Sequence, residues 1–251
     1  MTSLPIYIGY DPREQIAYDV CSYSLSRRAT VPTTIHSLRL DHLKDRGIYT
    51  REFIRDGQVR IDKIDGKPFS TDFAFTRFLV PYLQNYKGWA LFVDCDFLFR
   101  ADVGELEPYM DERYAMRVVK HQQPHTVDTK MDGQRQEPYP RKNWSSFILW
   151  NCAHPTNRDL GPIEVNTRTG RWLHGFGWLR DEEIGDLPQT WNWLSGLNLP
   201  IPDPKAVHYT LGGPWFPDWQ TVPYGKEWRA ECRQMESNET PADLRSATSG
   251  R

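Results

Sequence analysis

Two aspartates on either side of a cysteine are the residues of this sequence best suited to holding a metal ion. Asp94 and Asp96 follow the apolar run 89–93, and an acid at the carboxyl end of a central strand lies where open α/β sheets bind ligands. Because side chains alternate along a strand, both carboxylates are expected on one side, where their repulsion favours a shared cation. Hard oxygen ligands of this kind select Mg²⁺ or Mn²⁺. The alternative is a pair of solvated acids that cap a following helix.

A second candidate segment lies near the carboxyl end and runs from residue 207 to 215 with the sequence VHYTLGGPW. The neutral imidazole of His208 can ligate Mn²⁺. Gly212 and Gly213 allow the backbone to approach a ligand closely, because they carry no Cβ. The alternative is a turn that packs Trp215 on the core.

The elements expected to position these residues alternate between strands and helices. Apolar runs bounded by turn residues predict strands over 4–9, 33–37, 89–93, 114–119 and 146–150. A 3.6-residue period predicts helices over 13–28 and 71–86, and Pro81 is expected to end or kink the second one. Residues 41–70 are charged and contain several glycines, so we expect them to be irregular. The alternation favours an α/β sheet built from βαβ units.

Length and composition indicate a globular chain. It has 251 residues, of which 39% are hydrophobic and 13% aromatic, which excludes a disordered protein. We predict a single domain over residues 1–235 and a disordered tail over residues 236–251. The polar segment 121–143 is too long for an ordinary connection and is expected to be a functional loop or a lid.

Charge and cysteine usage exclude several classes of protein. The net charge is −2, so no overall field attracts nucleic acid or an anionic membrane. The sequence shows neither a secretion signal nor an apolar run of membrane-spanning length. Its four cysteines are far apart, which argues against a disulfide framework and a cysteine zinc site. We therefore predict a cytoplasmic protein.

Several stretches, taken in order along the chain, resemble glycosyltransferase family 8, the group of glycogenin and bacterial galactosyltransferases. Asp94-Cys95-Asp96 resembles the metal motif of that family, and residues 208–215 resemble its late His-aromatic-x-x-Gly-x-Pro-Trp segment. The other matching stretches are 9–11 (GYD), 75–83 (FTRFLVPYL), 143–151 (NWSSFILWN) and 181–192 (DEEIGDLPQTWN). The resemblance implies the GT-A fold, a Rossmann-like mixed central sheet flanked by helices.

The resemblance also implies an activity, the metal-dependent transfer of a hexose from a nucleoside diphosphate sugar, in particular a UDP-sugar, with retention of configuration. Asp94, Asp96 and His208 would hold Mn²⁺ or Mg²⁺ on the two phosphates, where the metal neutralises charge on the leaving diphosphate. The other residues implied in donor binding are Gly9, Tyr10, Asp11, Arg77, Cys95, Gly212 and Gly213. Asp181 and Glu182 are implied as catalytic residues against the transferred sugar.

Each of these roles has a plain structural alternative. Asp11 could cap the helix that follows it. Arg77 could form a surface ion pair instead of a fixed cation near the donor. Asp181 and Glu182 could be solvated acids at the start of a helix.

The sequence also departs from the family pattern. Gly213 stands where the family has a lysine before Pro-Trp, so one donor-phosphate cation is missing. Arg77, Lys205 or the basic segment 130–142 could replace it. Ser145 and Ser146 stand where the family has Asn followed by Ala or Ser, which removes an expected sugar-binding amide. These changes leave the two aspartates and the histidine intact.

Two other classes of function stay open at this point. A nucleotidyltransferase would use the same paired carboxylates but normally has a glycine-rich phosphate loop, whereas residues 9–14 contain one glycine. A carbohydrate-binding protein could use the ten tryptophans for stacking and would need no metal. For a transferase, the acceptor could be a glycan, a lipid-linked sugar, a protein or a modified nucleobase on DNA. Residues 226–229 could touch a membrane surface or form a plain helix.

Overall fold

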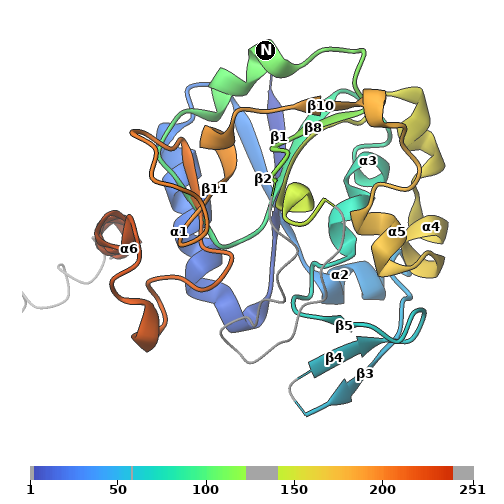
Figure 1. Ribbon diagram of the computed structural model, residues 1–251, viewed down its shortest axis with the longest axis horizontal. Helices are drawn as coiled ribbons and strands as arrows, with labels where there is room; N and C mark the ends of the chain where they lie inside the picture. The colour runs from blue at the N-terminus through green and yellow to red at the C-terminus, as the bar shows by residue number, and fades with distance from the viewer. Residues whose placement is uncertain (1–2, 58, 123–140, 240–251) are drawn as a thin grey trace, which may run out of the picture.

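The computed structural model describes residues 3–57, 59–122 and 141–239, which fold around a mixed six-stranded sheet (Figure 1). The strand order is β10-β8-β9-β6-β1-β2. The strands are β1 (Leu4–Gly9), β2 (Thr33–Leu38), β6 (Trp89–Val93), β8 (Met116–Val118), β9 (Phe147–Asn151) and β10 (Ile184–Asp186). β1 pairs in parallel with β2 and β6, whereas β9 runs antiparallel to both β6 and β8. The predicted α/β class and the predicted mixed central sheet are thus confirmed.

Helices cover both faces of this sheet, with α1 on one side of β1 and β2 and α3, α4 and α5 on the other (Figure 1). The α-helices are α1 (Gln15–Arg28), α2 (Leu40–Asp45), α3 (Val80–Leu83), α4 (Pro162–Thr167), α5 (Gly170–His174) and α6 (Gly225–Glu239). Short 3₁₀ turns are η1 (Pro12–Glu14), η2 (Thr76–Leu79), η3 (Val103–Tyr109), η4 (Trp144–Ser146), η5 (Pro155–Asp159), η6 (Asp181–Glu183), η7 (Gln189–Asn192) and η8 (Pro217–Trp219). None of the helices described combines the length and the apolar character that a membrane crossing requires.

A second sheet joins the middle of the chain to its late part. It consists of β7 (Phe97–Phe99), β11 (Trp193–Leu194) and β12 (Ala206–His208), in the order β11-β12-β7. β7 and β12 are antiparallel, and His208 lies opposite Phe97 in the register. Phe97 directly follows the Asp94-Cys95-Asp96 segment, so this pairing carries the histidine to the aspartates.

The prediction that residues 41–70 are irregular is wrong. It contains α2 and an antiparallel three-stranded sheet of β3 (Phe53–Asp56), β4 (Val59–Asp62) and β5 (Pro68–Phe69). A buried ion pair explains its order, because Arg51 is held by Asp62 and by the carbonyls of Val165 and Arg168. Figure 1 shows the small sheet projecting below the central one.

The predicted helix over residues 71–86 is also wrong in extent. Helical structure is limited to η2 and α3, and Pro81 lies in the first turn of α3, where its missing N–H is tolerated. Asn85 and Tyr86 have φ values of 51° and 53°, and this left-handed backbone ends the helix. The first predicted helix is confirmed, with a 3₁₀ turn at residues 12–14 before α1.

The carboxyl end differs from the predicted tail at residue 236. α6 continues to Glu239, and residues 240–251 lie outside the described part of the chain. Trp228 on α6 is 4% exposed and packs against Trp215, so residues 226–229 form part of a helix that packs on the core through Trp228. Most of the predicted functional loop or lid, residues 121–143, cannot be compared, because residues 123–140 lie outside the described part of the chain.

Candidate functional site

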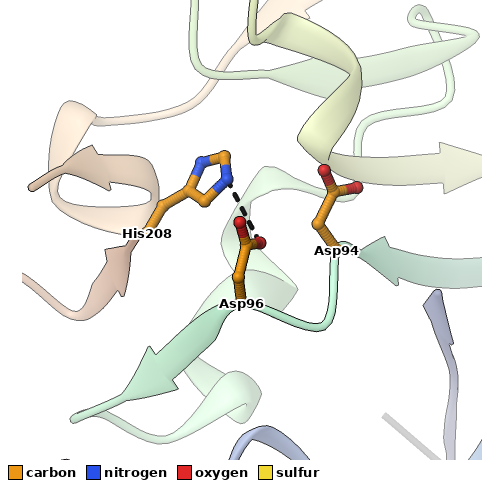
Figure 2. Close-up of side chains that lie close together, drawn as sticks. All are labelled: Asp94, Asp96 and His208. Atoms are coloured by element: carbon orange, nitrogen blue, oxygen red, sulfur yellow. Dashed lines mark ion pairs between the residues drawn. The ribbon is translucent and has the colours of Figure 1, made fainter. Parts of the chain in front are cut away.

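Asp94 and Asp96 lie in the short turn between β6 and β7. The chain turns at residues 95 and 96 instead of continuing as a strand. The expected alternation of side chains along a strand therefore does not explain why the two carboxylates lie close together. Backbone bonds hold the turn in place instead: the Asp94 N–H donates to the Ser146 carbonyl at 2.9 Å, and the Tyr209 N–H donates to the Asp96 carbonyl at 3.0 Å. Figure 2 shows the two carboxylates and the His208 ring pointing toward a common space.

These three side chains form a group that could hold a metal ion. One ligand atom from each of Asp94, Asp96 and His208 lies within 4.8 Å of the other two. The Nε2 atom of His208 is 3.3 Å from Asp96 Oδ1 (Figure 2). Two carboxylate oxygens and one imidazole nitrogen suit Mn²⁺ and, with the oxygens dominating, Mg²⁺.

His208 is held rigidly from two sides. Its ring is 1% exposed and stacks on Phe97, with centroids 4.4 Å apart and planes 16° apart. Its Nδ1 atom is 2.9 Å from the amide oxygen of Asn192. The aromatic stack and this contact together point Nε2 at the aspartates.

Arg77 neutralises part of the charge of the site. Its Nη1 atom lies 2.8 Å from Asp94 Oδ1 and also donates to the Ser145 carbonyl at 2.8 Å. The guanidinium lies between the rings of Phe73 and Phe92, 5.3 and 5.1 Å from their centroids. Arg77 is 5% exposed, so the alternative of a surface ion pair is wrong.

The residues at the end of β1 that were predicted to bind the donor make structural contacts. A Cβ on Gly9 would come within 2.5 Å of the Phe73 ring, so only glycine fits. Tyr10 is 8% exposed and carries the guanidinium of Arg39 over its ring at 3.7 Å. Asp11 is fully buried and caps η1 by accepting from the Arg13 N–H at 3.1 Å, as in the capping alternative.

The charge on Asp11 is stabilised despite its burial. Burial alone would raise the pKa of Asp11, but the hydrogen bonds and charge of Arg13, and then the charge of Arg60, outweigh it and hold that pKa below its usual value. The backbone N–H of Asp72 also donates to Asp11, at 3.1 Å. Asp11 thus ties the end of β1 to the start of the helical segment.

Cys95, between the two aspartates, points into the core. Its side chain is fully buried, and its Sγ lies 3.3 Å from Glu14 Oε2. Burial first, and then the charge of Glu14, raise the pKa of the Cys95 thiol well above its usual value. Among the described residues, the group that could hold a metal ion does not include this thiol.

Gly212 and Gly213 form a turn that packs Trp215 on the core, as the structural alternative expected. Gly212 has a φ of 146°, which only glycine adopts readily. A Cβ on Gly213 would lie 1.9 Å from the Trp215 ring. Trp215 in turn packs edge-on against Tyr209, with centroids 5.9 Å apart.

Asp181 and Glu182 lie on the exposed turn η6. Their side chains are 87% and 68% exposed and form ion pairs with Arg141 and Arg180 respectively. The next residue, Glu183, is 6% exposed and accepts from the Arg180 N–H at 2.8 Å. Among the described residues the potential ligand group consists of Asp94, Asp96 and His208, and it does not include these two acids.

Two residues near His208 were not predicted from the sequence to belong to the site. Asn192 is fully buried and contacts the imidazole, although its only signal was the Trp-Asn pair in a matching stretch. His121 is 8% exposed, and its buried Nε2 has no hydrogen-bond partner among the described residues. Burial, and then the nearby His208, lower the pKa of His121 to about 3.

Solved structures with similar folds are glycosyltransferases. The bifunctional glycosyltransferase WbbM is 14% identical with a TM-score of 0.57, covering 96% of this chain and 52% of its own. GlyE of Streptococcus pneumoniae is 13% identical with a TM-score of 0.57, covering 95% of this chain and 63% of its own. The galactosyltransferase LgtC, solved with donor and acceptor sugar analogues, is 11% identical with a TM-score of 0.53, covering 97% of this chain and 99% of its own.

These likenesses define the class of fold: the chain is a single-domain protein with the GT-A fold of glycosyltransferases. It spans about half of the WbbM chain and less than two thirds of the GlyE chain. No protein-family model matches the sequence. Protein CDI of Arabidopsis thaliana is 46% identical over 244 residues, covering 95% of this chain and 90% of that protein, so the chain belongs to the same family as protein CDI.

Proposed function

We propose that the protein is a metal-dependent glycosyltransferase that moves a hexose from a nucleoside diphosphate sugar to an acceptor, with retention of configuration. In this reaction the bond between the anomeric carbon and the diphosphate oxygen breaks, and a bond to an acceptor hydroxyl oxygen forms on the same face of the sugar. The hydroxyl proton passes to the leaving diphosphate. The observation that carries the proposal is the convergence of Asp94, Asp96 and His208 from two distant parts of the chain. The shared fold with LgtC, a galactosyltransferase, supports it.

The three candidate ligand side chains suit a divalent cation. Asp94, Asp96 and His208 would hold Mn²⁺ or Mg²⁺, which would supply positive charge to the leaving diphosphate. Arg77 offsets one of the two aspartate charges through its contact with Asp94, which leaves the site with one net negative charge from these groups. A remaining negative charge favours a divalent cation over an isolated phosphate.

The catalytic assignment of Asp181 and Glu182 belongs to this proposal. Their exposed side chains are free to reorient, since exposed ion pairs contribute little energy. If they act on the transferred sugar, Asp181→Asn and Glu182→Gln lower kcat and leave the binding of metal and nucleotide unchanged. Uracil as the donor base is a further part of the proposal, as is membership of glycosyltransferase family 8.

Thermal unfolding with Mn²⁺ and UDP tests the central claim. A ligand present at 100 times its dissociation constant stabilises the folded state by about 2.7 kcal/mol, which raises the melting temperature by roughly 5–10 °C in a chain of this size. The increase is expected to be largest when Mn²⁺ and UDP are present together, with a smaller increase for Mn²⁺ alone. A parallel assay follows hydrolysis of UDP- and GDP-sugars with and without Mn²⁺.

Two variants complete this experiment. Asp96→Asn removes a ligand charge and is expected to abolish the shift. Asp186→Asn is the matched control, because the Asp186 side chain is 74% exposed and pairs with Lys120 at the end of β10. Absence of a shift with both UDP and GDP in the presence of Mn²⁺ would overturn the proposal.

A further inference from the structure

The Nδ1 atom of His208 faces two polar groups, and their hydrogens decide which ring nitrogen carries a proton. Asn192 Oδ1 is 2.9 Å from Nδ1, and Ser146 Oγ is 3.4 Å from it. His208, Asn192 and Ser146 are 1%, 0% and 3% exposed. Water therefore has little access to the Nδ1 side of the ring, and the protein itself must satisfy this atom.

The carbonyl of Asn143 fixes the orientation of both neighbours. A carbonyl oxygen only accepts hydrogen bonds. The Ser146 hydroxyl donates to it at 2.8 Å, and the Asn192 amide nitrogen donates to it at 3.3 Å. The same amide nitrogen donates to Ser146 Oγ at 2.9 Å. The amide nitrogen of Asn192 is thus directed at Asn143 and Ser146, and its oxygen is directed at the imidazole.

The position of the proton on His208 follows from this arrangement. Asn192 Oδ1 can only accept, so Nδ1 must be the atom that carries the hydrogen. The Ser146 hydroxyl has already given its hydrogen to Asn143, so it does not donate to Nδ1. A neutral His208 then carries a lone pair on Nε2, and that atom lies 3.3 Å from Asp96 Oδ1. Two electron-rich atoms face each other across the space that a cation would fill.

We propose that Asn192, oriented by Ser146 and Asn143, is a positioning residue that holds His208 as the Nδ1–H tautomer and so presets Nε2 as a metal ligand. This inference rests on the proposed function for the identity of the ligand, but the tautomer itself is a property of the metal-free chain. A hydrogen-bond partner behind a ligating histidine fixes its ring and its basicity, and loss of such a partner typically lowers metal affinity 10–100-fold. Without Asn192, the proton moves to Nε2, where Asp96 accepts it.

Nitrogen NMR of the His208 ring tests the tautomer without any metal. In the metal-free wild-type protein near pH 8 we expect hydrogen on Nδ1 and a bare Nε2. In Asn192→Leu, which keeps the side-chain size but removes both polar atoms, we expect hydrogen on Nε2. Asn192→Asp retains an acceptor for Nδ1 and should keep the wild-type tautomer. An Nε2–H ring in the wild type, or an unchanged tautomer in Asn192→Leu, would overturn the inference.

Binding of Mn²⁺ to the nucleotide-free protein, followed by the electron paramagnetic resonance signal of the free ion, gives the second readout. Asn192→Leu should bind about 10–100-fold more weakly than the wild type, and Asn192→Asp should remain close to the wild type. Asn157→Leu is the matched control, because Asn157 is also fully buried and donates to the carbonyls of Ala115 and Asn151, away from His208.

The two readouts separate the two proposals. A wild-type protein that binds Mn²⁺ neither alone nor together with UDP overturns the metal-dependent function, while the tautomer measurement still decides the role of Asn192. Equal Mn²⁺ affinities of Asn192→Leu and the wild type, with Mn²⁺ bound by both, overturn the role of Asn192 alone.

Discussion

Arg77 and Asp94 form a buried ion pair, with Nη1 and Oδ1 2.8 Å apart and side-chain exposures of 6% and 15%. The pair links η2 to the turn after β6. The Arg77 guanidinium therefore both positions Asp94, a predicted metal ligand, and offsets its negative charge. The same guanidinium bonds to the carbonyls of Ser145 and Phe73, at 2.8 and 3.3 Å. Three segments of the site therefore meet at one side chain.

Removal of this guanidinium should be costly. Arg77→Met leaves the Asp94 carboxylate and the Ser145 carbonyl without their cationic partner, and breaking one side of a buried pair typically costs about 3–5 kcal/mol. Urea unfolding of the metal-free protein measures the loss. Arg113→Met is the control, since Arg113 is 78% exposed in its pair with Asp111 and should change stability by less than about 1 kcal/mol. Similar losses in both variants would contradict the buried role of Arg77.

The buried His121 side chain should make the protein less stable in acid. Its pKa is lowered to about 3 by burial and then by His208, whereas an unfolded histidine has a pKa near 6.5. Below about pH 6.5 the unfolded chain takes up a proton that the folded chain refuses until about pH 3, so stability falls as the pH falls through this window. From pH 7.5 to pH 5.0 this one group should contribute a loss of about 2 kcal/mol.

Denaturant unfolding at the two pH values measures this loss. His121→Gln should remove it, so that the variant becomes less sensitive to acid than the wild type. His42→Gln is the matched control, because His42 is exposed on α2 and its removal should leave the wild-type pH dependence intact. The same acid sensitivity in His121→Gln as in the wild type would show that His121 is not held neutral.

The sequence indicated which three side chains could form a metal site, but it did not indicate the strand pairing that brings them together. Asp94 and Asp96 were identified from their place after the apolar run 89–93, and β6 is indeed buried along residues 90–93. Their proximity to His208, however, depends on the pairing of β7 with β12, and a three-residue strand gives no local signal of its distant partner. The neighbours Asn192 and Ser146 are short polar side chains whose importance comes only from this long-range pairing.

The failed prediction at residues 41–70 has a different physical reason. The segment was predicted to be irregular because it is charged and contains several glycines, but β4 buries two of its charged side chains, Arg60 and Asp62, at 3% and 1% exposure. On β3, Ile54 is 51% exposed. The polar side chains face inward because they form ion pairs, so an apolar alternation could not reveal this small sheet.

The Arg51–Asp62 pair should anchor that small sheet. Its two bonds, from Nε to Oδ1 at 2.8 Å and from Nη2 to Oδ2 at 2.6 Å, are nearly inaccessible to water. Arg51→Met should lower the free energy of unfolding by about 3–5 kcal/mol, because Asp62 is left buried without its partner. Hydrogen exchange should show the largest loss of protection in β4. The double variant Arg51→Met/Asp62→Leu removes both charges and should recover most of the loss, whereas a purely additive double variant would contradict this account.

The packing of Trp215 leaves no room for a side chain at Gly213, where the pattern of glycosyltransferase family 8, which the sequence resembles, has a lysine. A Cβ at this position would lie 1.9 Å from the Trp215 ring, which packs against Tyr209 and Trp228. Gly213→Lys should therefore displace Trp215 and lower stability by about 1–3 kcal/mol, rather than restore a phosphate contact. Tryptophan near-ultraviolet circular dichroism and urea unfolding measure the two effects, with Gln234→Lys, which adds a lysine at an exposed position of α6, as the control. A Gly213→Lys variant with wild-type stability and tighter UDP binding would show that the ring moves aside easily and that the site lacks only a cation.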